Sequence, residues 1–228
     1  MTMQRARPKR LILIRHGETA WNREERIQGQ LDAPLNALGV RQAALTAQAL
    51  MAGGWFEGVE EIVSSDLSRA LDTASAIAEI SGLPLRQERS LRERHFGELQ
   101  GITYAEWRQA DAEGLARFRA GDPDYGPPGG ETARDFLRRC VEAVTHLVMS
   151  ASGSHVLAVT HGGVISSLYR HSRLLGFASE RTWSVPNASL SVWHLRWPDS
   201  GVEFVCERIG DAAHLEGSET AALEAIEK

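Results

Sequence analysis

Residues 11–17 of the chain read Leu-Ile-Leu-Ile-Arg-His-Gly, and this stretch decides how the rest of the sequence folds. Four consecutive aliphatic residues predict a short strand that is buried on both faces, as in a parallel sheet covered by helices. Such a strand carries Arg15 and His16 into a glycine-marked turn at its carboxyl end, where open α/β sheets bind ligands. An arginine fork grips phosphate oxygens and a neutral imidazole nitrogen can attack phosphorus, so the pair indicates a site for an anionic substrate.

Length and composition predict one α/β domain with an elaboration. The chain has 228 residues, of which 43% are hydrophobic, enough to bury a substantial core. Its formal charge of −5 argues against nucleic-acid partners, because polyanion binding needs a basic face. No long apolar run and no signal-peptide core follow the basic N-terminus, so we expect an untargeted cytoplasmic protein without membrane contact.

The cysteines and the missing metal-ligand motifs exclude other chemistries. Cys140 and Cys206 predict no disulfide framework and fit a reducing compartment. Neither begins the Cys-x5-Arg loop of cysteine-dependent phosphatases, because His146 and Ala212 occupy the sixth positions after them. HExxH, Cys-x-x-Cys and GxxxxGK motifs are also missing, so the sequence predicts neither a metal centre nor a nucleotide P-loop.

Apolar patterns predict strands that alternate with helices, and hence a three-layer αβα sandwich around a mostly parallel sheet. Asn36 and Thr132 are typical helix caps. Ser65 or Asp66 is expected to cap a helix between them, which places Arg69 in its first turn, where unpaired N–H groups and the arginine attract the same anion. The predicted strands span residues 11–14, 61–64, 83–85 and 155–159, with a final hairpin at 190–195 and 202–205, and the helix after Asn36 is expected to bury Val40, Ala43, Ala44, Ala47, Leu50 and Met51.

Two segments depart from this alternation. Residues 102–130 place Trp107 and further apolar residues at helical spacings before a run rich in Gly, Pro and Asp, which predicts a small helical insertion that acts as a lid over the site. The end of the chain is acidic and alanine-rich, so we expect one domain over residues 1–210 and a frayed tail over residues 211–228, with a terminal helix as the alternative.

Six motifs follow one another along the chain. The first is RHGETAWN at residues 15–22, and the others are IQGQLDAPLNALGVRQA at 27–43, SSDLSRALDTA at 64–74, LRERHFGELQG at 91–101, GGET at 129–132 and VTHGGVI at 159–165. Together they resemble the histidine phosphatase superfamily, which includes cofactor-dependent phosphoglycerate mutases, fructose-bisphosphatase domains and broad-specificity phosphatases. The resemblance covers the chain from about Leu11 to Cys206 and implies a phosphoglycerate mutase-like domain.

The resemblance also implies a role for each matching residue. His16 would be the phosphorylated nucleophile, and Glu93 would donate a proton to the leaving oxygen and then act as base for water. The phosphate pocket would consist of Arg15, Arg69 and His161, completed by donors from Asn22, Gln28, Gly29 and the backbone N–H of Gly162. This chemistry needs no metal and no cofactor.

The histidines are expected to differ in charge. A nucleophile has to be neutral whereas a phosphate clamp works best protonated, and the ordinary histidine pKa near 6.5 lets the surroundings shift it either way. We therefore expect a neutral His16 and a protonated His161. The other histidines are predicted to be surface or core groups, although His95 lies close to Glu93.

The insertion separates two activities of the family. The segment ERHFGELQG is similar to the mutase version, in which Arg94 and His95 follow the acid. Mutases, however, hold the phosphoglycerate carboxylate with a lysine and an adjacent arginine pair, whereas residues 102–130 contain no lysine and only Arg108, Arg117 and Arg119. We therefore predict a phosphoric monoester hydrolase of the histidine acid phosphatase type for a small phosphorylated metabolite. The alternatives are a 2,3-bisphosphoglycerate-dependent phosphoglycerate mutase and a catalytically silent phosphate-binding domain.

The sequence determines neither the leaving group of the substrate nor the oligomeric state of the protein. Five aromatic residues either line a site for an apolar leaving group or belong to the core, namely Trp21, Phe96, Trp107, Phe118 and Tyr125. The apolar C-terminal strands could pair across a homodimer.

Overall fold

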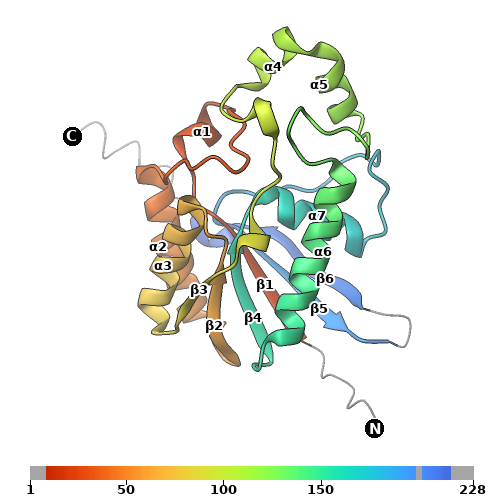
Figure 1. Cartoon of the computed structure of the whole chain (residues 1–228). Coiled ribbons are helices and arrows are strands. Elements are labelled where there is room, and N and C mark those ends of the chain that lie inside the picture. The colour runs from red at the N-terminus through yellow and green to blue at the C-terminus, as the bar shows by residue number, and fades with distance from the viewer. Residues whose placement is uncertain (1–8, 199–201, 217–228) are drawn as a thin grey trace, which may run out of the picture.

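A six-stranded mixed sheet forms the centre of the computed structural model, which describes residues 9–198 and 202–216 (Figure 1). The strands are β1 (Lys9–Arg15), β2 (Val59–Ser64), β3 (Leu85–Gln87), β4 (His155–Thr160), β5 (Leu190–Arg196) and β6 (Glu203–Asp211), in the order β3-β2-β4-β1-β5-β6. The first four strands of this order are parallel, and β5 and β6 form the predicted antiparallel hairpin. The prediction of a mostly parallel sheet is therefore confirmed.

Helices cover both faces of the sheet, as the sandwich prediction requires (Figure 1). The helices α2 (Ala37–Ala52) and α3 (Ser68–Ser81) pack on one face, and α6 (Ala133–Ser150) and α7 (Gly162–Ser172) pack on the other. Alternate side chains of β1 enter the two cores: Leu11 and Leu13 belong to the α6/α7 cluster, and Ile12 and Ile14 to the α2/α3 cluster. An uninterrupted apolar strand is what a sheet covered on both sides demands.

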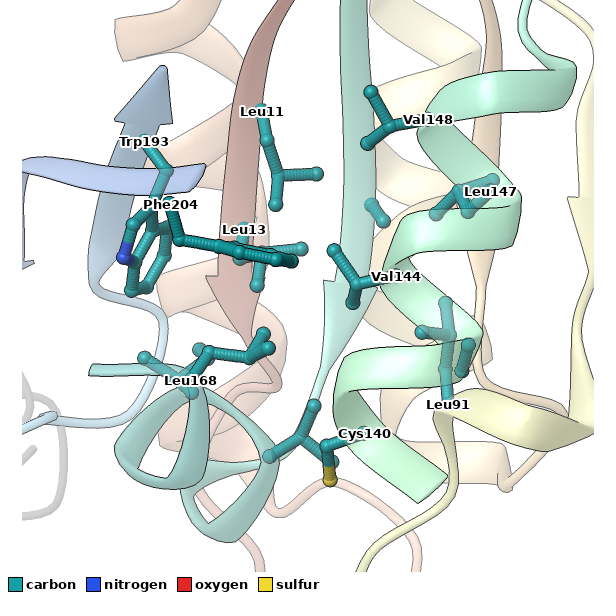
Figure 2. Packing of buried hydrophobic residues seen from close by; sticks show 14 of the residues in the cluster. Leu11, Leu13, Leu91, Cys140, Val144, Leu147, Val148, Leu168, Trp193 and Phe204 are labelled. Carbon is teal, nitrogen blue, oxygen red and sulfur yellow. The ribbon is translucent and has the colours of Figure 1, made fainter. Parts of the chain in front are cut away.

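The larger core lies between β1, β4 and the helices α6 and α7 (Figure 2). Leu13 meets Val144 of α6 and Leu168 of α7, while Trp193 of β5 and Phe204 of β6 close the cluster on the side of the hairpin. All five side chains are almost completely excluded from solvent. The hairpin therefore extends the sheet and also covers one end of its core.

The predicted apolar stripe of α2 is only partly correct. Asn36 caps the helix through its side chain as expected, but Val40 and Met51 are 58% and 47% exposed, and Ala44 is exposed as well. The buried positions include Gln42 and Thr46 instead. This face of α2 packs against loop backbone, where Gln42 accepts a hydrogen bond from the Glu18 N–H at 2.8 Å, so polar side chains are needed there.

The start of α3 also differs from the prediction. Neither Ser65 nor Asp66 caps this helix, which begins at Ser68 after Leu67 with no side-chain cap. Asp66 forms an ion pair with Arg92 at 2.6 Å, and Ser65 contacts a histidine ring described below. Both side chains thus bind residues distant in the sequence and do not cap the helix. Arg69 still lies in the first turn of α3.

The insertion packs with neighbouring residues of the chain around a small core. Its helices α4 (Tyr104–Ala110) and α5 (Ala112–Arg119) stand above the carboxyl ends of the strands, close to the short α1 (Ala20–Arg23) (Figure 1). The buried side chains Ile27, Leu99, Trp107, Leu115 and Tyr125 form a cluster separate from the two main cores. The remaining short elements are the 3-10 helices η1 (Arg89–Leu91), η2 (Gly97–Leu99) and η3 (Ala213–Leu215).

The chain continues as ordered structure past residue 210, where the frayed tail was expected to begin. Strand β6 extends to Asp211, whose carboxylate pairs with Arg208 and accepts a hydrogen bond from the Ala213 N–H at 3.0 Å. His214 of η3 then contacts Thr46 Oγ1 at 3.0 Å, which anchors the segment on α2. The rest of the predicted tail, residues 217–228, lies outside the described residues. Across the part of the chain that is described, no helix has the length and apolarity needed to cross a membrane.

The position of Leu13 in the larger core predicts a measurable loss of stability. Leu13→Ala is expected to lower the free energy of unfolding by about 2–5 kcal/mol, because it removes buried methyl groups and leaves a cavity. Leu174→Ala removes the same atoms from a side chain that is 92% exposed and should change the value by less than about 0.5 kcal/mol. Urea unfolding of both variants tests this, and equal losses would contradict the placement of Leu13.

Candidate active site

Strand register brings three sequence motifs to one level of the sheet. In the parallel pairing of β1 with β4, Arg15 lies opposite Thr160, so the next residues, His16 and His161, leave the sheet side by side. In the pairing of β2 with β4, Ser64 lies opposite Val159. Motifs separated by more than a hundred residues therefore meet at the carboxyl edge, as expected for a parallel sheet.

His16 is held as a neutral ring with a defined tautomer. Its ring centre lies 5.2 Å from that of His161, and its Nδ1 lies 2.7 Å from the carbonyl oxygen of Gly17. A carbonyl only accepts, so Nδ1 carries the proton and Nε2 keeps a lone pair. Burial first, and then the charges of Arg69 and Arg15, hold the pKa of His16 well below 6.5. The structure therefore contains the neutral ring that was expected at His16.

The two predicted arginines flank this ring. Arg69 is only 1% exposed and donates to the carbonyl of Gly29 at 2.7 Å, while Arg15 donates to the carbonyl of Val185 at 2.6 Å. Burial lowers the pKa of each guanidinium to about 10, against the opposing effect of Glu93. Both therefore stay charged at neutral pH. Their buried Nε atoms have no hydrogen-bond partner within the described residues, which leaves donors for an anion.

His161 differs from the expectation in its charge. Its Nε2 lies 2.8 Å from Ser65 Oγ, and its buried Nδ1 has no partner in the described part of the chain. Burial first, and then Arg69, His16 and Arg15, hold the pKa of His161 well below 6.5. The ring is thus neutral unless an anion binds beside it. Sequence reasoning missed this because the combined effect of burial and three neighbouring side chains depends on the tertiary structure.

Glu93 is fixed at both ends of its carboxylate. Its Oε1 accepts a hydrogen bond from the Arg94 N–H at 2.8 Å and its Oε2 from the Gly163 N–H at 2.9 Å. The carbonyl of Glu93 accepts from Gln30 and Arg139 at 3.0 and 3.1 Å. A Cβ on Gly163 would overlap Oε1, so only glycine leaves room for this carboxylate.

A cavity of about 780 Å³ opens above these groups. The predicted phosphate-binding residues Asn22, Gln28, Gly29 and Gly162 all line it, together with His16, Arg15, Arg69 and Glu93. His161 is fully buried and is not one of the lining residues, but its ring lies next to that of His16. Asn22 uses its carbonyl oxygen to accept from Asn187 at 3.2 Å, which leaves its amino group for the cavity. The structure therefore brings the predicted site residues together.

The aromatic residues divide into two groups. Trp21, Phe96 and Phe118 line the cavity, whereas Trp107 and Tyr125 belong to the core of the insertion. Three aromatic residues that sequence reasoning did not select also line the cavity, namely Tyr104, Phe177 and Trp183. The cavity is therefore lined by aromatic rings from α1, from the segment after Glu93, from the insertion and from the segment after α7.

Other residues at the site were also missed. Asn187 donates to the carbonyls of His16 and Gly17 at 3.1 and 3.2 Å, which fixes the loop after β1. Arg170 and Arg181 line the cavity. The segment from Gly176 to Ala188 has no periodicity, so no sequence signal pointed to it. Ser65 lies within the motif at 64–74, but its hydroxyl contacts the ring of His161 and does not cap a helix.

His95 does not join the site. It is absent from the lining of the cavity, and its Nδ1 accepts a hydrogen bond from the Gly97 N–H at 3.2 Å. Its own N–H donates to Glu131 at 2.8 Å, which ties the segment to the base of the insertion. Within residues 9–198 and 202–216 no three His, Cys, Asp or Glu side chains are grouped so that they could hold a metal ion.

Known proteins share both the sequence and the fold. The histidine phosphatase superfamily (branch 1) matches residues 11–209. A metal-independent phosphoserine phosphatase from Arabidopsis thaliana is 35% identical over 207 residues, which cover 90% of this chain and 82% of the relative. A probable phosphoglycerate mutase from Serratia proteamaculans is 36% identical over 228 residues, which cover 96% of this chain and 99% of the relative.

Among solved structures, a mycobacterial glucosyl-3-phosphoglycerate phosphatase superposes with a TM-score of 0.78. It is 34% identical, and the match covers 90% of this chain and all of the other. The family match spans most of the chain, and the relatives align over most of their length. The chain therefore belongs to the histidine phosphatase superfamily.

Proposed function

We propose that the protein is a metal-independent phosphomonoesterase that acts on a small phosphorylated metabolite through a phosphohistidine at His16. One observation carries this proposal: a buried, neutral His16 whose Nδ1 is bound to a carbonyl, so that Nε2 keeps its lone pair, flanked by Arg15 and Arg69 in a cavity. A group that is nucleophilic and surrounded by fixed cations suits attack on an anionic phosphoryl group.

In the first step, Nε2 of His16 attacks phosphorus and the bond from phosphorus to the ester oxygen breaks. The carboxyl of Glu93 gives its proton to the departing oxygen. Arg15, Arg69 and the N–H of Gly162 contact the phosphoryl oxygens, where each guanidinium at about 4 Å contributes on the order of 4 kcal/mol at an effective dielectric near 20. A phosphohistidine and a free alcohol result.

In the second step, Glu93 takes a proton from a water molecule, and the water oxygen attacks phosphorus. The bond between Nε2 of His16 and phosphorus breaks, which regenerates the neutral imidazole and yields inorganic phosphate. The two hydrogen bonds from Arg94 and Gly163 keep the carboxylate in one place for both proton transfers.

A mutase remains the second candidate because a relative of similar identity carries that name and because the segment after Glu93 is similar to the mutase version. The insertion favours hydrolysis, since residues 102–130 contain no lysine and no adjacent arginine pair. A silent binding domain is disfavoured because all five residues of the predicted catalytic set are present and adjacent.

Removal of the nucleophile tests the proposal directly. Release of phosphate from an aryl phosphate should persist in EDTA and fall by at least about 10³-fold in His16→Ala, because no other group can form the intermediate. His146→Ala, which changes an exposed histidine, should match the unaltered protein. Release that requires metal, or that survives in His16→Ala, would sink the proposal, and isomerisation of 3-phosphoglycerate primed by 2,3-bisphosphoglycerate without net phosphate would select the mutase.

The contact between Gly163 and Glu93 predicts a loss of rate without a loss of stability. Gly163→Ala places a methyl group on the Glu93 carboxylate, and a displaced acid–base group should lower kcat by about 10²-fold. The melting temperature should not fall, because alanine is the better helix residue. Gly176→Ala, where the nearest side chain leaves room, is the control. An unchanged kcat in Gly163→Ala would remove Glu93 from the mechanism.

The two buried neutral histidines make stability depend on pH. The unfolded chain binds protons on His16 and His161 near pH 6.5 whereas the folded protein does not, so the free energy of unfolding should decrease as pH falls below about 6.5. Each ring lowers the free energy of unfolding by up to about 1.4 kcal/mol for each pH unit below this value. Urea unfolding between pH 8 and pH 5 in phosphate-free buffer gives the free energy of unfolding at each pH. Its decrease with falling pH should be smaller in the double variant His16→Asn with His161→Asn than in the unaltered protein. An identical slope would contradict these pKa directions.

A further inference from the structure

Two arginines on one wall of the cavity have no role in the chemistry described above. Arg170 lies in α7 and Arg181 in the loop that follows it, and both line the cavity together with Trp183. Neither forms an ion pair with a carboxylate within the described residues, although Glu180 is adjacent in sequence. In this part of the chain they are cations with no carboxylate paired to them.

The positive charge of the whole cavity is in excess. Seven arginines and two glutamates line it, and one of these glutamates, Glu93, already belongs to the acid–base chemistry. Burial first, and then the charge of Arg181, lower the pKa of Arg170. Arg181 also acts on Arg15, so the wall and the phosphate pocket share one field. An anion that binds between arginines offsets the repulsion between their positive charges.

The guanidinium groups of Arg170 and Arg181 are also held in place, and each keeps N–H donors that bind no protein group in the described part of the chain. Both lie against the buried ring of Trp183, with distances of 5.2 Å for Arg170 and 5.9 Å for Arg181 from the ring centre. Arg181 uses Nε to bind the Trp183 carbonyl at 3.1 Å, and Arg170 uses one terminal nitrogen for the carbonyls of Gly176 and Ser179. Each therefore keeps unused N–H groups, which suit the oxygens of a carboxylate or phosphate.

From this juxtaposition we infer that Arg170 and Arg181 form a second oxyanion subsite, and that the substrate is a phosphomonoester whose alcohol part carries another anionic group. This inference rests on the proposed phosphomonoesterase function. It places the second anion on α7 and the loop after it, not on the insertion. The volume of about 780 Å³ leaves room for an alcohol part that extends from one subsite to the other.

Alkyl phosphates that differ only at their far end test the inference. Propyl phosphate, 3-phosphooxypropanoate and propane-1,3-diol bisphosphate end in a methyl group, a carboxylate and a second phosphate, and six-carbon versions cover a longer span. The unaltered protein should prefer one of the two members with a second anionic group over the methyl member by about tenfold or more in kcat/KM. The comparison of carboxylate with phosphate identifies the anion.

Single variants then locate the subsite. Arg170→Gln and Arg181→Gln should each lower that preference by about tenfold, whereas Arg173→Gln, which removes an exposed arginine at the end of the same helix, should leave it unchanged. A preference that is absent, or that survives in both variants at both chain lengths, overturns the inference. A preference lost only in Arg119→Gln moves the second anion to the insertion and overturns it as well.

A binding measurement separates failure of the subsite from failure of the proposed function. Calorimetric titration with propylphosphonate and 3-phosphonopropanoate, and with their six-carbon versions, needs no turnover. Tighter binding of the carboxylate member that is lost in Arg170→Gln and Arg181→Gln supports the subsite even if no phosphomonoester is hydrolysed. Equal binding of both members overturns the subsite, while hydrolysis of propyl phosphate that is lost in His16→Ala still supports the phosphomonoesterase.

Discussion

The parallel pairing of β1 with β4 is the constraint on which the site depends. Because Arg15 lies opposite Thr160, the two histidine-bearing turns leave the sheet at one height, and the neighbouring pairing of β2 with β4 adds Ser65 to them. A shift of one residue in either pairing would turn these side chains to the other face of the sheet. The alternating burial of β1 between two cores fixes the register. Core packing therefore determines which side chains meet at this edge of the sheet.

The backbone after β1 is also held tightly. Gly17 and Gly39 approach so closely that a Cβ on either residue would collide with backbone of the other segment, which seats the turn on the first turn of α2. Asn187 binds the same turn from the side of β5. The polar residues on the inner face of α2 follow from this arrangement, because buried backbone groups need partners. His16 thus lies on a support that is fixed from two directions.

Local signals in the sequence predicted much of this arrangement. The uninterrupted apolar strand at 11–14 gave the sheet and its two covered faces, and the site residues His16, Arg69 and His161 each follow or begin an element that periodicity identified. The predictions were wrong where contacts with residues distant in the sequence determine what a side chain does. Ser65 contacts the ring of His161 instead of capping a helix, and burial keeps His161 neutral. The segment that carries Arg181 has no repeating pattern, so its place at the cavity follows only from the folded chain.

The separate side-chain cluster at the insertion has a consequence for how members of this superfamily can diversify. Trp107, Leu115 and Tyr125 pack with Ile27 and Leu99 in a small cluster that is separate from the two main cores, and Arg94 donates to the carbonyls of Tyr125 and Glu131 at the base of the insertion. Sequence drift in α4 and α5 can therefore reshape the roof of the cavity while the sheet beneath stays unchanged. Change can thus be confined to the insertion, and the residues at the carboxyl edge of the sheet keep their arrangement.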